Sequence, residues 1–439
     1  MRLRLVGAVS LAAALVVVAA GLGRSDSLPV PAAVAASSSP VSPPLAIVGQ
    51  QLLRVDRQTL APLATARVPV GSGGCASRSG GESCWAIPPW SFSPDDGHLA
   101  IARNGRSALE SLRLVDVGSL RAVADLRVPG GPIGALAWLA PSRMVALQEI
   151  CCSGRQKLLV VDVSRRRVTA RRALWGSVLR LAQGPRELVV LLAPPNRVGE
   201  ARLAVVDAEG ALRIVRLGRV AAGASPEGGS TARAPISIPG LAVDTAGRRA
   251  FVVTPALVAS IDLRNLAVSY HRPSTSASLL ARFRAWLQPA AQAKEATGPV
   301  RTARWLGGGV IAVTGAQVDR RESKPAGLLL VDTRTWRART IDAHASGLAL
   351  GDDVLLATGG TTGVTAYGLD GRKRFRLFDG EHAWVDRVFD GRAYVGISGP
   401  RGPKGGLRIV DLAAGRSVGE RPMPMPWLLL ERSGGWWSY

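Results

Sequence analysis

The stretch GLLLVDTRTW, residues 327–336, contains the motif that decides the fold. An apolar run ends at Asp332, a short polar turn follows, and an aromatic residue comes last. Apolar and β-branched runs favour strands, and an aspartate side chain accepts hydrogen bonds from the backbone of the turn that follows it. The stretch therefore predicts a strand, an aspartate turn and a return strand.

The same motif recurs along the chain. Stretches such as SLRLVDVGSL, KLLVVDVSRR and GLRIVDLAAG repeat it, and the apolar runs end at Asp116, Asp162, Asp207, Asp262, Asp332, Asp370 and Asp411. An eighth copy, LLRVDRQT, lies near residue 55. Successive spacings from Asp116 are 46, 45, 55, 70, 38 and 41 residues. Periods of roughly 40 to 50 residues are typical of propeller blades.

A second hairpin lies upstream of each copy. Stretches such as WSFSPDDGHLAIA and WVDRVFDGRAYVGI show a strand, an Asp/Gly turn and a strand, so each unit contains four predicted strands. Radial packing of such sheets buries their faces and leaves only short edges. The sequence predicts an all-β propeller of four-stranded blades over residues 45–431.

The two ends of the repeat set the number of blades. The first copy lacks an innermost strand, and PMPMPWLLLERS, residues 422–433, has no hairpin partner of its own. We expect residues 427–431 to complete the first blade and close the ring, which gives eight blades. Seven is the alternative, if the short unit at 346–378 is a decorated loop.

Three stretches carry a family resemblance. They are the turn FSPDDG at 92–97, the strand AFVVT at 250–254 followed by SIDLRN, and AYVGI at 393–397 followed by RIVDLAAG. The units resemble those of bacterial extracytoplasmic propellers of the YVTN type, within the wider WD40-like and quinoprotein-like group. The resemblance implies a propeller but no particular ligand, because such propellers serve many roles.

The N-terminus predicts export. A short basic segment precedes the charge-free apolar run of residues 5–22, and Ala33-Val34-Ala35 offers a small-residue cleavage site. Residues 1–35 are interpreted as a signal peptide, followed by a Pro/Ser/Ala linker at 36–44. The alternative is an uncleaved anchor, since the apolar run is just long enough to span a bilayer. Either way, we expect a secreted or extracytoplasmic protein, membrane-tethered in the second case.

No motif for catalysis, cofactor or metal binding is recognised. The four histidines have no short ligand spacing, and HExxH, GxSxG, phosphate-loop and calcium-loop patterns are absent from the sequence. The repeated aspartates occupy one turn position, which explains them structurally. We therefore assign no catalytic, cofactor-binding or metal residue.

Four cysteines in an exported chain suggest two disulfides. The candidates are Cys75, Cys84, Cys151 and Cys152, in loop classes that emerge on one face of a propeller. Cys75–Cys84 with a vicinal Cys151–Cys152 bridge is favoured, and a cross-link between the two loops is the alternative. A vicinal pair also resembles that of some eight-bladed quinone-dependent alcohol dehydrogenases. A quinone- or metal-dependent enzyme with a site at the central channel is therefore the alternative function.

Tryptophans recur at one blade position. Trp90, Trp138, Trp305, Trp384 and Trp427 lie in or beside a first strand, which favours packing between blades over a sugar-binding surface. Residues 432–439 form an aromatic tail.

Residues 276–288, SASLLARFRAWLQ, interrupt the β pattern. Their apolar spacing predicts an amphipathic helix within an insertion at 274–298. The helix could lie on the propeller's own face, cover the channel, bind a partner or contact a membrane surface. Its candidate partner-binding residues are Leu279, Leu280, Phe283, Trp286, Leu287, Arg282 and Arg284.

The charge is strongly basic, with a net charge of +23, and only five of the 55 basic residues are lysine. Outside the cytoplasm, this charge favours an anionic envelope polymer or membrane head groups, although an arginine-rich composition alone would also produce it. We expect no nucleic-acid partner, because no aromatic-basic module accompanies the export signal. The sequence predicts a monomeric binding or scaffold module for an anionic envelope component or an unknown protein.

Overall fold

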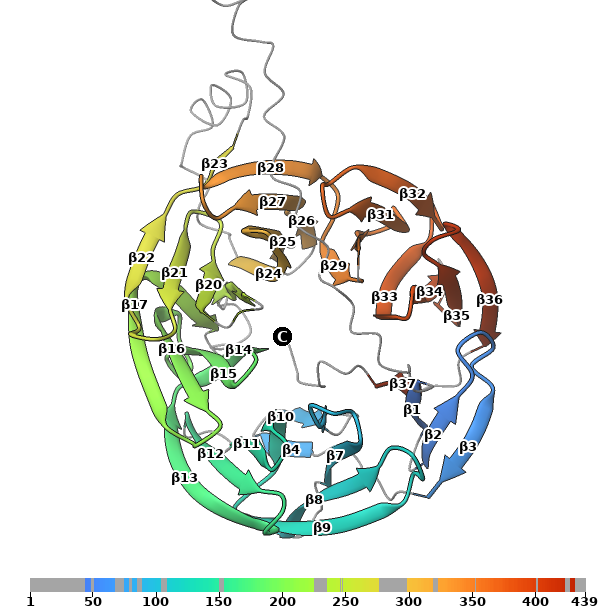
Figure 1. Cartoon of the computed structure of the whole chain (residues 1–439). Helices are drawn as coiled ribbons and strands as arrows, with labels where there is room; N and C mark the ends of the chain where they lie inside the picture. The colour runs from blue at the N-terminus through green and yellow to red at the C-terminus, as the bar shows by residue number, and fades with distance from the viewer. Residues whose placement is uncertain are drawn as a thin grey trace, which may run out of the picture.

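The computed structural model describes residues 44–48, 51–67, 75–78, 81–84, 89–103, 109–149, 154–224, 235–244, 246, 248–275, 298–318, 323–351, 353–399, 402–422 and 427–430. They form an all-β ring of eight radial sheets, each built on four antiparallel strands (Figure 1). The prediction of eight blades is confirmed. The unit at 346–378 is a complete blade and not a loop.

The four strands of each blade lie side by side, from the innermost at the centre of the ring to the outermost at its perimeter. The first two blades contain β37 (Trp427–Leu429), β1 (Leu45–Val48), β2 (Gln51–Val55) and β3 (Pro62–Ala66), then β6 (Trp90–Phe92), β7 (His98–Arg103), β8 (Leu109–Asp116) and β9 (Ala122–Pro129). The third and fourth contain β10 (Ile133–Ala140), β11 (Arg143–Glu149), β12 (Arg155–Asp162) and β13 (Arg167–Trp175), then β14 (Ser177–Gln183), β15 (Glu187–Ala193), β16 (Gly199–Asp207) and β17 (Leu212–Ala224).

The second half of the ring repeats this order. The fifth and sixth blades contain β19 (Gly240–Val243), β20 (Arg249–Val253), β21 (Val258–Asp262) and β22 (Val268–His271), then β24 (Gly298–Gly307), β25 (Val310–Val318), β27 (Leu328–Asp332) and β28 (Arg337–Asp342). The last two contain β29 (Gly347–Leu350), β30 (Val354–Thr358), β31 (Val364–Gly368) and β32 (Lys373–Leu377), then β33 (His382–Phe389), β34 (Arg392–Gly399), β35 (Gly402–Asp411) and β36 (Arg416–Pro422).

The ring closes as predicted. Strand β37 pairs antiparallel with β1, in the register Ala46↔Leu429 and Val48↔Trp427. The innermost strand of the first blade thus comes from the other end of the chain, and neither end of the sheet arrangement is left open.

The hydrophobic core lies between the blades. One cluster, for example, combines Val189 and Leu203 of the fourth blade with Val252 and Ile261 of the fifth, all buried. Strand residues therefore pack through both faces of a sheet, which explains the apolar runs that the sequence shows in the middle strands.

The repeated aspartates close the turns between the third and fourth strands, as predicted. In all eight blades an aspartate Oδ1 accepts hydrogen bonds from backbone N–H groups two to four residues ahead, at 2.6 to 3.4 Å. Four residues after the aspartate, the chain adopts the left-handed conformation at Leu60, Leu120, Arg166, Leu266 and Trp336. One turn geometry therefore repeats around the ring.

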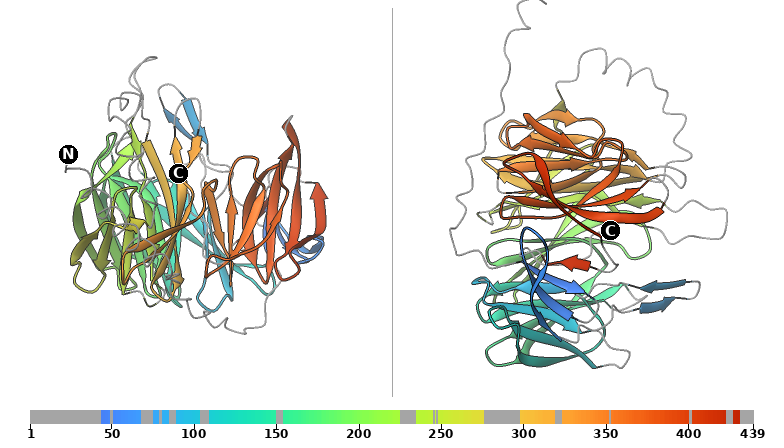
Figure 2. Two further views of the ribbon diagram at one scale, coloured as in Figure 1. Left: turned by 90° about the horizontal axis from the view of Figure 1, so that it is seen from above. Right: turned by 90° about the vertical axis from the view of Figure 1, so that its right-hand side faces the viewer.

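The two faces of the ring differ. Turns after the first and third strands of a blade lie on one face, and antiparallel alternation places all other connections on the opposite face. A short hairpin, β4 (Cys75–Arg78) and β5 (Gly81–Cys84), belongs to the connection between the first two blades. Figure 2 shows this blue hairpin standing out from the ring.

Three short strands extend the blades. Strand β18 (Ile236–Ser237) pairs with β17, β26 (Ser323–Pro325) pairs with β25, and β23 (Ser274–Thr275) pairs in parallel with β28. The insertion predicted at 274–298 therefore begins in β23 and ends at the first residue of β24. The helix predicted within it lies outside the described residues. The described segments contain no helix long and apolar enough to cross a membrane.

Candidate functional site

The sequence-predicted partner residues fall on parts of the chain that the structure does not describe. Leu279, Leu280, Arg282, Phe283, Arg284, Trp286 and Leu287 all lie outside the described residues, as do Cys151 and Cys152. Cys75 and Cys84 lie directly opposite one another in the β4–β5 register. Within the described segments, no group of three His, Cys, Asp or Glu residues could hold a metal ion.

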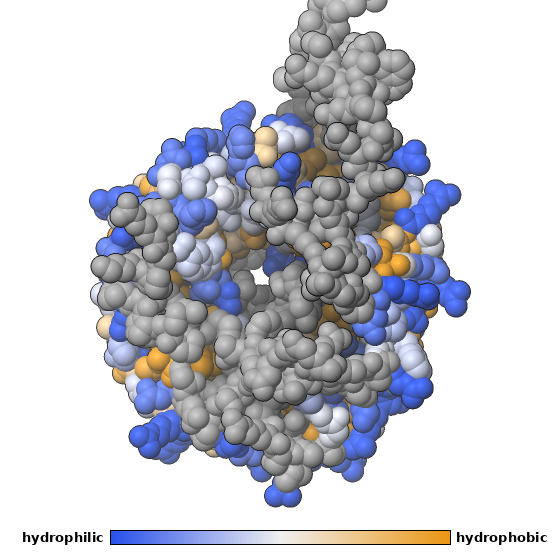
Figure 3. All heavy atoms as spheres, turned by 180° about the vertical axis from the view of Figure 1, so that it is seen from behind, coloured by the Kyte–Doolittle hydropathy of each residue, from blue (hydrophilic) through white to orange (hydrophobic). Residues whose placement is uncertain are grey.

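The innermost strands carry an unbalanced charge. The eight strands nearest the axis contain four arginines, Arg180, Arg301, Arg304 and Arg387, and one carboxylate, Asp386. Figure 3 shows a small opening near the middle of the ring, with hydrophilic residues at part of its rim. The centre of the propeller is therefore a basic environment.

Two of these arginines are presented by β-bulges. The pairing register shifts between Val178 and Arg180 in β14, and between Val385 and Arg387 in β33. A bulge adds one residue to a strand and re-aims the side chains beside it. The two bulged strands lie on opposite sides of the ring, in the fourth and eighth blades (Figure 1).

Arg180 is the most buried of the four, with 7% of its surface exposed. It donates hydrogen bonds to the carbonyls of Leu179 and Arg301, both at 3.2 Å, and so connects the fourth blade to the sixth. Burial, and secondarily the charge of Arg304, lowers the pKa of Arg180 to about 10. The side chain is still cationic at neutral pH, in a place where positive charge is electrostatically unfavourable.

Arg301 and Arg304 complete this group on β24. Arg301 is half-buried, donates to the carbonyls of Val300 and Ala316 at 3.2 Å, and has a pKa lowered by burial. Arg304 is exposed. We call Arg180, Arg301 and Arg304 the inner arginine group. Its three guanidinium groups offer donors and charge suited to a phosphate or carboxylate.

Arg387 has a structural role on the other side of the ring. Its Nε donates to the carbonyl of Leu429 in β37 at 2.9 Å, and its guanidinium lies 5.8 Å from the ring centroid of Trp90. It also forms an ion pair with Asp386 at 3.6 Å. Arg387 thereby connects the eighth, first and second blades.

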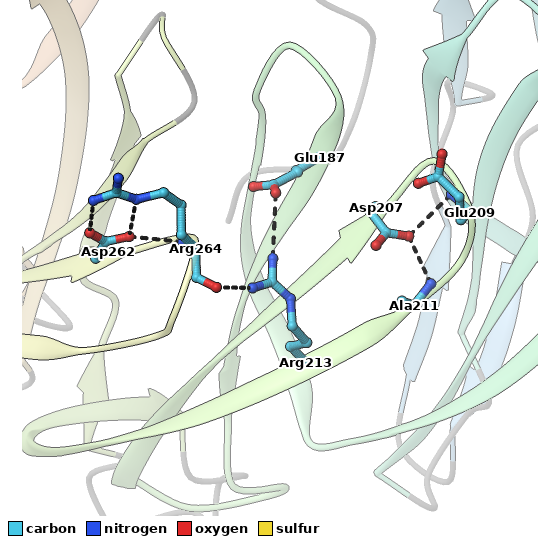
Figure 4. A network of polar contacts seen from close by, with 7 residues as sticks. All are labelled: Glu187, Asp207, Glu209, Ala211, Arg213, Asp262 and Arg264. Carbon is cyan, nitrogen blue, oxygen red and sulfur yellow. Dashed lines mark hydrogen bonds and ion pairs between the residues drawn. The ribbon is translucent and has the colours of Figure 1, made fainter.

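Arginines at the perimeter connect neighbouring blades in a repeated way. Arg213 of β17 donates to the carbonyl of Arg264, in the aspartate turn of the next blade, at 2.8 Å (Figure 4). Arg213 also pairs with Glu187 at 3.4 Å, although burial raises the pKa of that carboxyl. The same link to the next blade's turn is made by Arg339 and Arg421 of outermost strands, and by Arg54 of β2, the third strand of the first blade. Part of the basic charge is therefore structural.

The tryptophans that the sequence places at one recurring blade position have two outcomes in the structure. Trp90 and Trp138 are buried, and Trp305 stacks on Phe251 with ring centroids 5.4 Å apart, so packing between blades is confirmed for these three. The prediction is wrong for Trp384, which is 49% exposed. The side chain of Trp427 is not described.

Comparisons with known proteins show the fold but no family. No protein-family model and no curated protein matches the chain. The chain is similar to the solved structure of the dihydro-heme d1 dehydrogenase NirN in complex with DHE, with 15% identity, a TM-score of 0.53, and coverage of 91% of this chain and 78% of that chain. The computationally designed protein Ika8 is similar at 10% identity and a TM-score of 0.46, over 77% of this chain and 88% of that one. At such identities the likeness shows the fold alone.

Proposed function

We propose that this protein is an extracytoplasmic binding module whose propeller holds an anionic envelope component at its centre. The observation that carries the proposal is the charge of the innermost strands, where four arginines accompany one carboxylate. Arginine recognises phosphate and carboxylate groups through paired hydrogen bonds, and a partly buried site strengthens these interactions. The predicted export signal and the net charge of +23 support an envelope polymer or anionic head group as the ligand.

Within this site, Arg304 is the arginine that a ligand can reach. It is exposed, and Arg180 lies near enough for the charge of Arg304 to lower its pKa. An anion bound between them would relieve this repulsion. Arg180 and Arg301 donate to backbone carbonyls, so they also fix the geometry of the site.

The experiment is calorimetric titration of the full chain with inorganic polyphosphate at low and high NaCl. We expect binding at low salt that weakens strongly at high salt. Arg304→Gln should weaken it by about ten- to a hundredfold, the loss expected for one charge-assisted hydrogen bond of roughly 1.5–3 kcal/mol. Arg171→Gln is the matched control, because Arg171 is an exposed arginine on the outermost strand β13. Equal weakening in both variants would show diffuse attraction and no central site.

A propeller enzyme is the second candidate, because the same fold occurs in a solved structure named as a dehydrogenase, NirN. It would hold a quinone or metal at the same central position. Protein exported by its own N-terminal segment would then carry a chromophore absorbing in the near-ultraviolet or visible range, or a stoichiometric metal. A colourless, metal-free protein that binds polyphosphate through Arg304 supports the binding module instead.

A further inference from the structure

Trp384 differs from the other tryptophans of the inner strands. It lies on β33, the innermost strand of the eighth blade, and is 49% exposed. Among the described residues, no aromatic ring or cation stacks on it. Trp175 is similarly exposed, at 47%, but the guanidinium of Arg155 lies 4.1 Å from its ring centroid. Within the described part of the chain, Trp384 is thus an exposed indole without a stacking partner.

A glycine supports the indole from one side. Trp384 and Gly396 are directly opposite in the β33–β34 register, and a Cβ added to Gly396 would lie 2.2 Å from Cε2 and 2.3 Å from Cζ2 of the indole. The ring therefore rests on the glycine backbone, where any larger residue would displace it. One indole face is covered and held in place, which agrees with the half-exposed surface.

The side of the sheet on which the indole lies follows from the pleat. Gly396 shares a face of β34 with Tyr394, whose hydroxyl donates to the carbonyl of Arg57 in the first blade at 3.0 Å. Trp384 consequently faces the first blade. The innermost strand of that blade is the ring-closing β37, Trp427–Leu429. Trp138, by contrast, faces the preceding blade and is buried among residues of the second blade.

Polar side chains lie next to the indole on the same face. His382 and Ser398 form the next directly opposed pair along the two strands, two residues from Trp384 and Gly396. Two residues of a strand span about 7 Å, so an imidazole and a hydroxyl lie one same-face position along the strands from the indole. His382 is exposed and Ser398 is partly exposed.

We propose that Trp384 is a stacking platform for a pyranose ring, with His382 and Ser398 binding the sugar's hydroxyl groups. A sugar has an apolar C–H face that packs on indole and a polar rim that needs hydrogen-bond partners, and this surface offers both. An acyl chain would need a continuous apolar surface in place of His382 and Ser398. The inference rests on the proposed function and refines it, since the anionic ligand becomes an acidic glycan that reaches from Trp384 in the eighth blade across the centre of the ring to the inner arginine group of the fourth and sixth blades.

The experiment compares two polyanions on the full chain. An oligomer of galacturonic acid carries sugar and charge, and polyphosphate carries charge alone. Trp384→Ala should weaken binding of the oligogalacturonate about tenfold, as for loss of one aromatic anchor, and leave polyphosphate binding unchanged. Trp384→Phe should retain part of the affinity. Trp175→Ala is the matched control and should change neither titration. Thermal unfolding checks that the variants fold, and since Trp384 is half-exposed we expect its removal to be tolerated.

The outcomes separate this inference from the proposed function. If polyphosphate binds and oligogalacturonate does not, or if Trp384→Ala leaves oligogalacturonate binding unchanged, the sugar platform is overturned and the anion site stands. Equal weakening of both probes by Trp384→Ala also overturns the platform, because the ring would then act without sugar specificity. If neither probe binds the unaltered chain, the proposed function fails as well.

Discussion

Replacement of Tyr394 by phenylalanine tests how the ring is held closed. Tyr394 is fully buried in β34, stacks on Phe389 with ring centroids 4.6 Å apart, and donates to the carbonyl of Arg57 in the first blade at 3.0 Å. Phenylalanine keeps the packing of the aromatic side chain and removes only this hydrogen bond. Because Arg57 is partly exposed, water can replace the lost donor, so the cost should be about 1 kcal/mol.

The effect should be concentrated at the junction between the eighth and first blades. A loss of about 1 kcal/mol raises the population of a locally open state about fivefold. The unfolding entropy of roughly 390 residues, at about 2.1 cal/mol/K per residue, is large. The same loss of free energy therefore lowers the global midpoint of thermal unfolding by only about 1 °C. Amide hydrogen exchange of peptides covering β1 and β37 is therefore the sensitive assay, and exchange there should be about fivefold faster.

The matched control is Tyr367→Phe. Tyr367 lies in β31 and donates to the carboxylate of Asp342 at 2.9 Å, so it links the sixth and seventh blades away from the closure. Burial and this carboxylate raise its pKa to about 12, so its hydroxyl stays protonated at neutral pH. This variant should leave exchange of β1 and β37 unchanged. Unaltered exchange there in Tyr394→Phe, or equal acceleration in both variants, would refute the role of Tyr394 in closure.

Three further predictions concern the turns, the perimeter and the hairpin. Backbone and Ser164 hydrogen bonds lower the pKa of Asp162 to about 2. The contribution of Asp162 to stability is therefore present above about pH 4 and is lost as the pH falls toward about 2. Asp162→Asn keeps an acceptor oxygen but does not titrate, so it should flatten this part of the pH dependence of stability, measured by urea unfolding at a series of acidic pH values. Arg213→Met should destabilise the chain by about 1–2 kcal/mol in urea unfolding, because the acceptors of Arg264 and Glu187 lose their donor, whereas Arg216→Met, at an exposed site of the same strand, should have little effect. Cys75 and Cys84 should be recovered as one linked peptide pair by mass spectrometry of unreduced digests, and free thiols at both positions would contradict that pairing.

The sequence predicted the blades because one local chemical rule repeats. Each apolar run ends at an aspartate whose oxygen accepts turn amides, and this requirement is visible without any knowledge of long-range contacts. Closure by residues 427–431 was predictable for a similar reason, since the first unit lacked a strand and the last segment lacked a partner. Both inferences depend on counting strands and not on side-chain positions.

The candidate site was not predictable in this way. Arg180 and Arg301 are 121 positions apart in sequence, and only the curvature of the ring brings them together. A signal was present, because SVLRLAQ and VRTARWL place arginines inside apolar first strands, where a charge is unfavourable. Trp384 shows the opposite limit: the sequence groups it with Trp138, but Trp138 lies opposite Met144 and packs toward the second blade, whereas Trp384 lies opposite Gly396, faces the first blade and is exposed.

The net charge of the chain cannot be interpreted as one property. Arg54, Arg213, Arg339 and Arg421 donate to carbonyls of the next blade's turn, so their charge is a consequence of how the blades are joined. These residues would attract a polyanion only over a long range, and salt would screen that attraction. Arg304, on an innermost strand and beside the buried Arg180, can combine attraction with a defined geometry. A net charge of +23 therefore favours encounter with any polyanion, whereas specificity depends on the few arginines of the innermost strands.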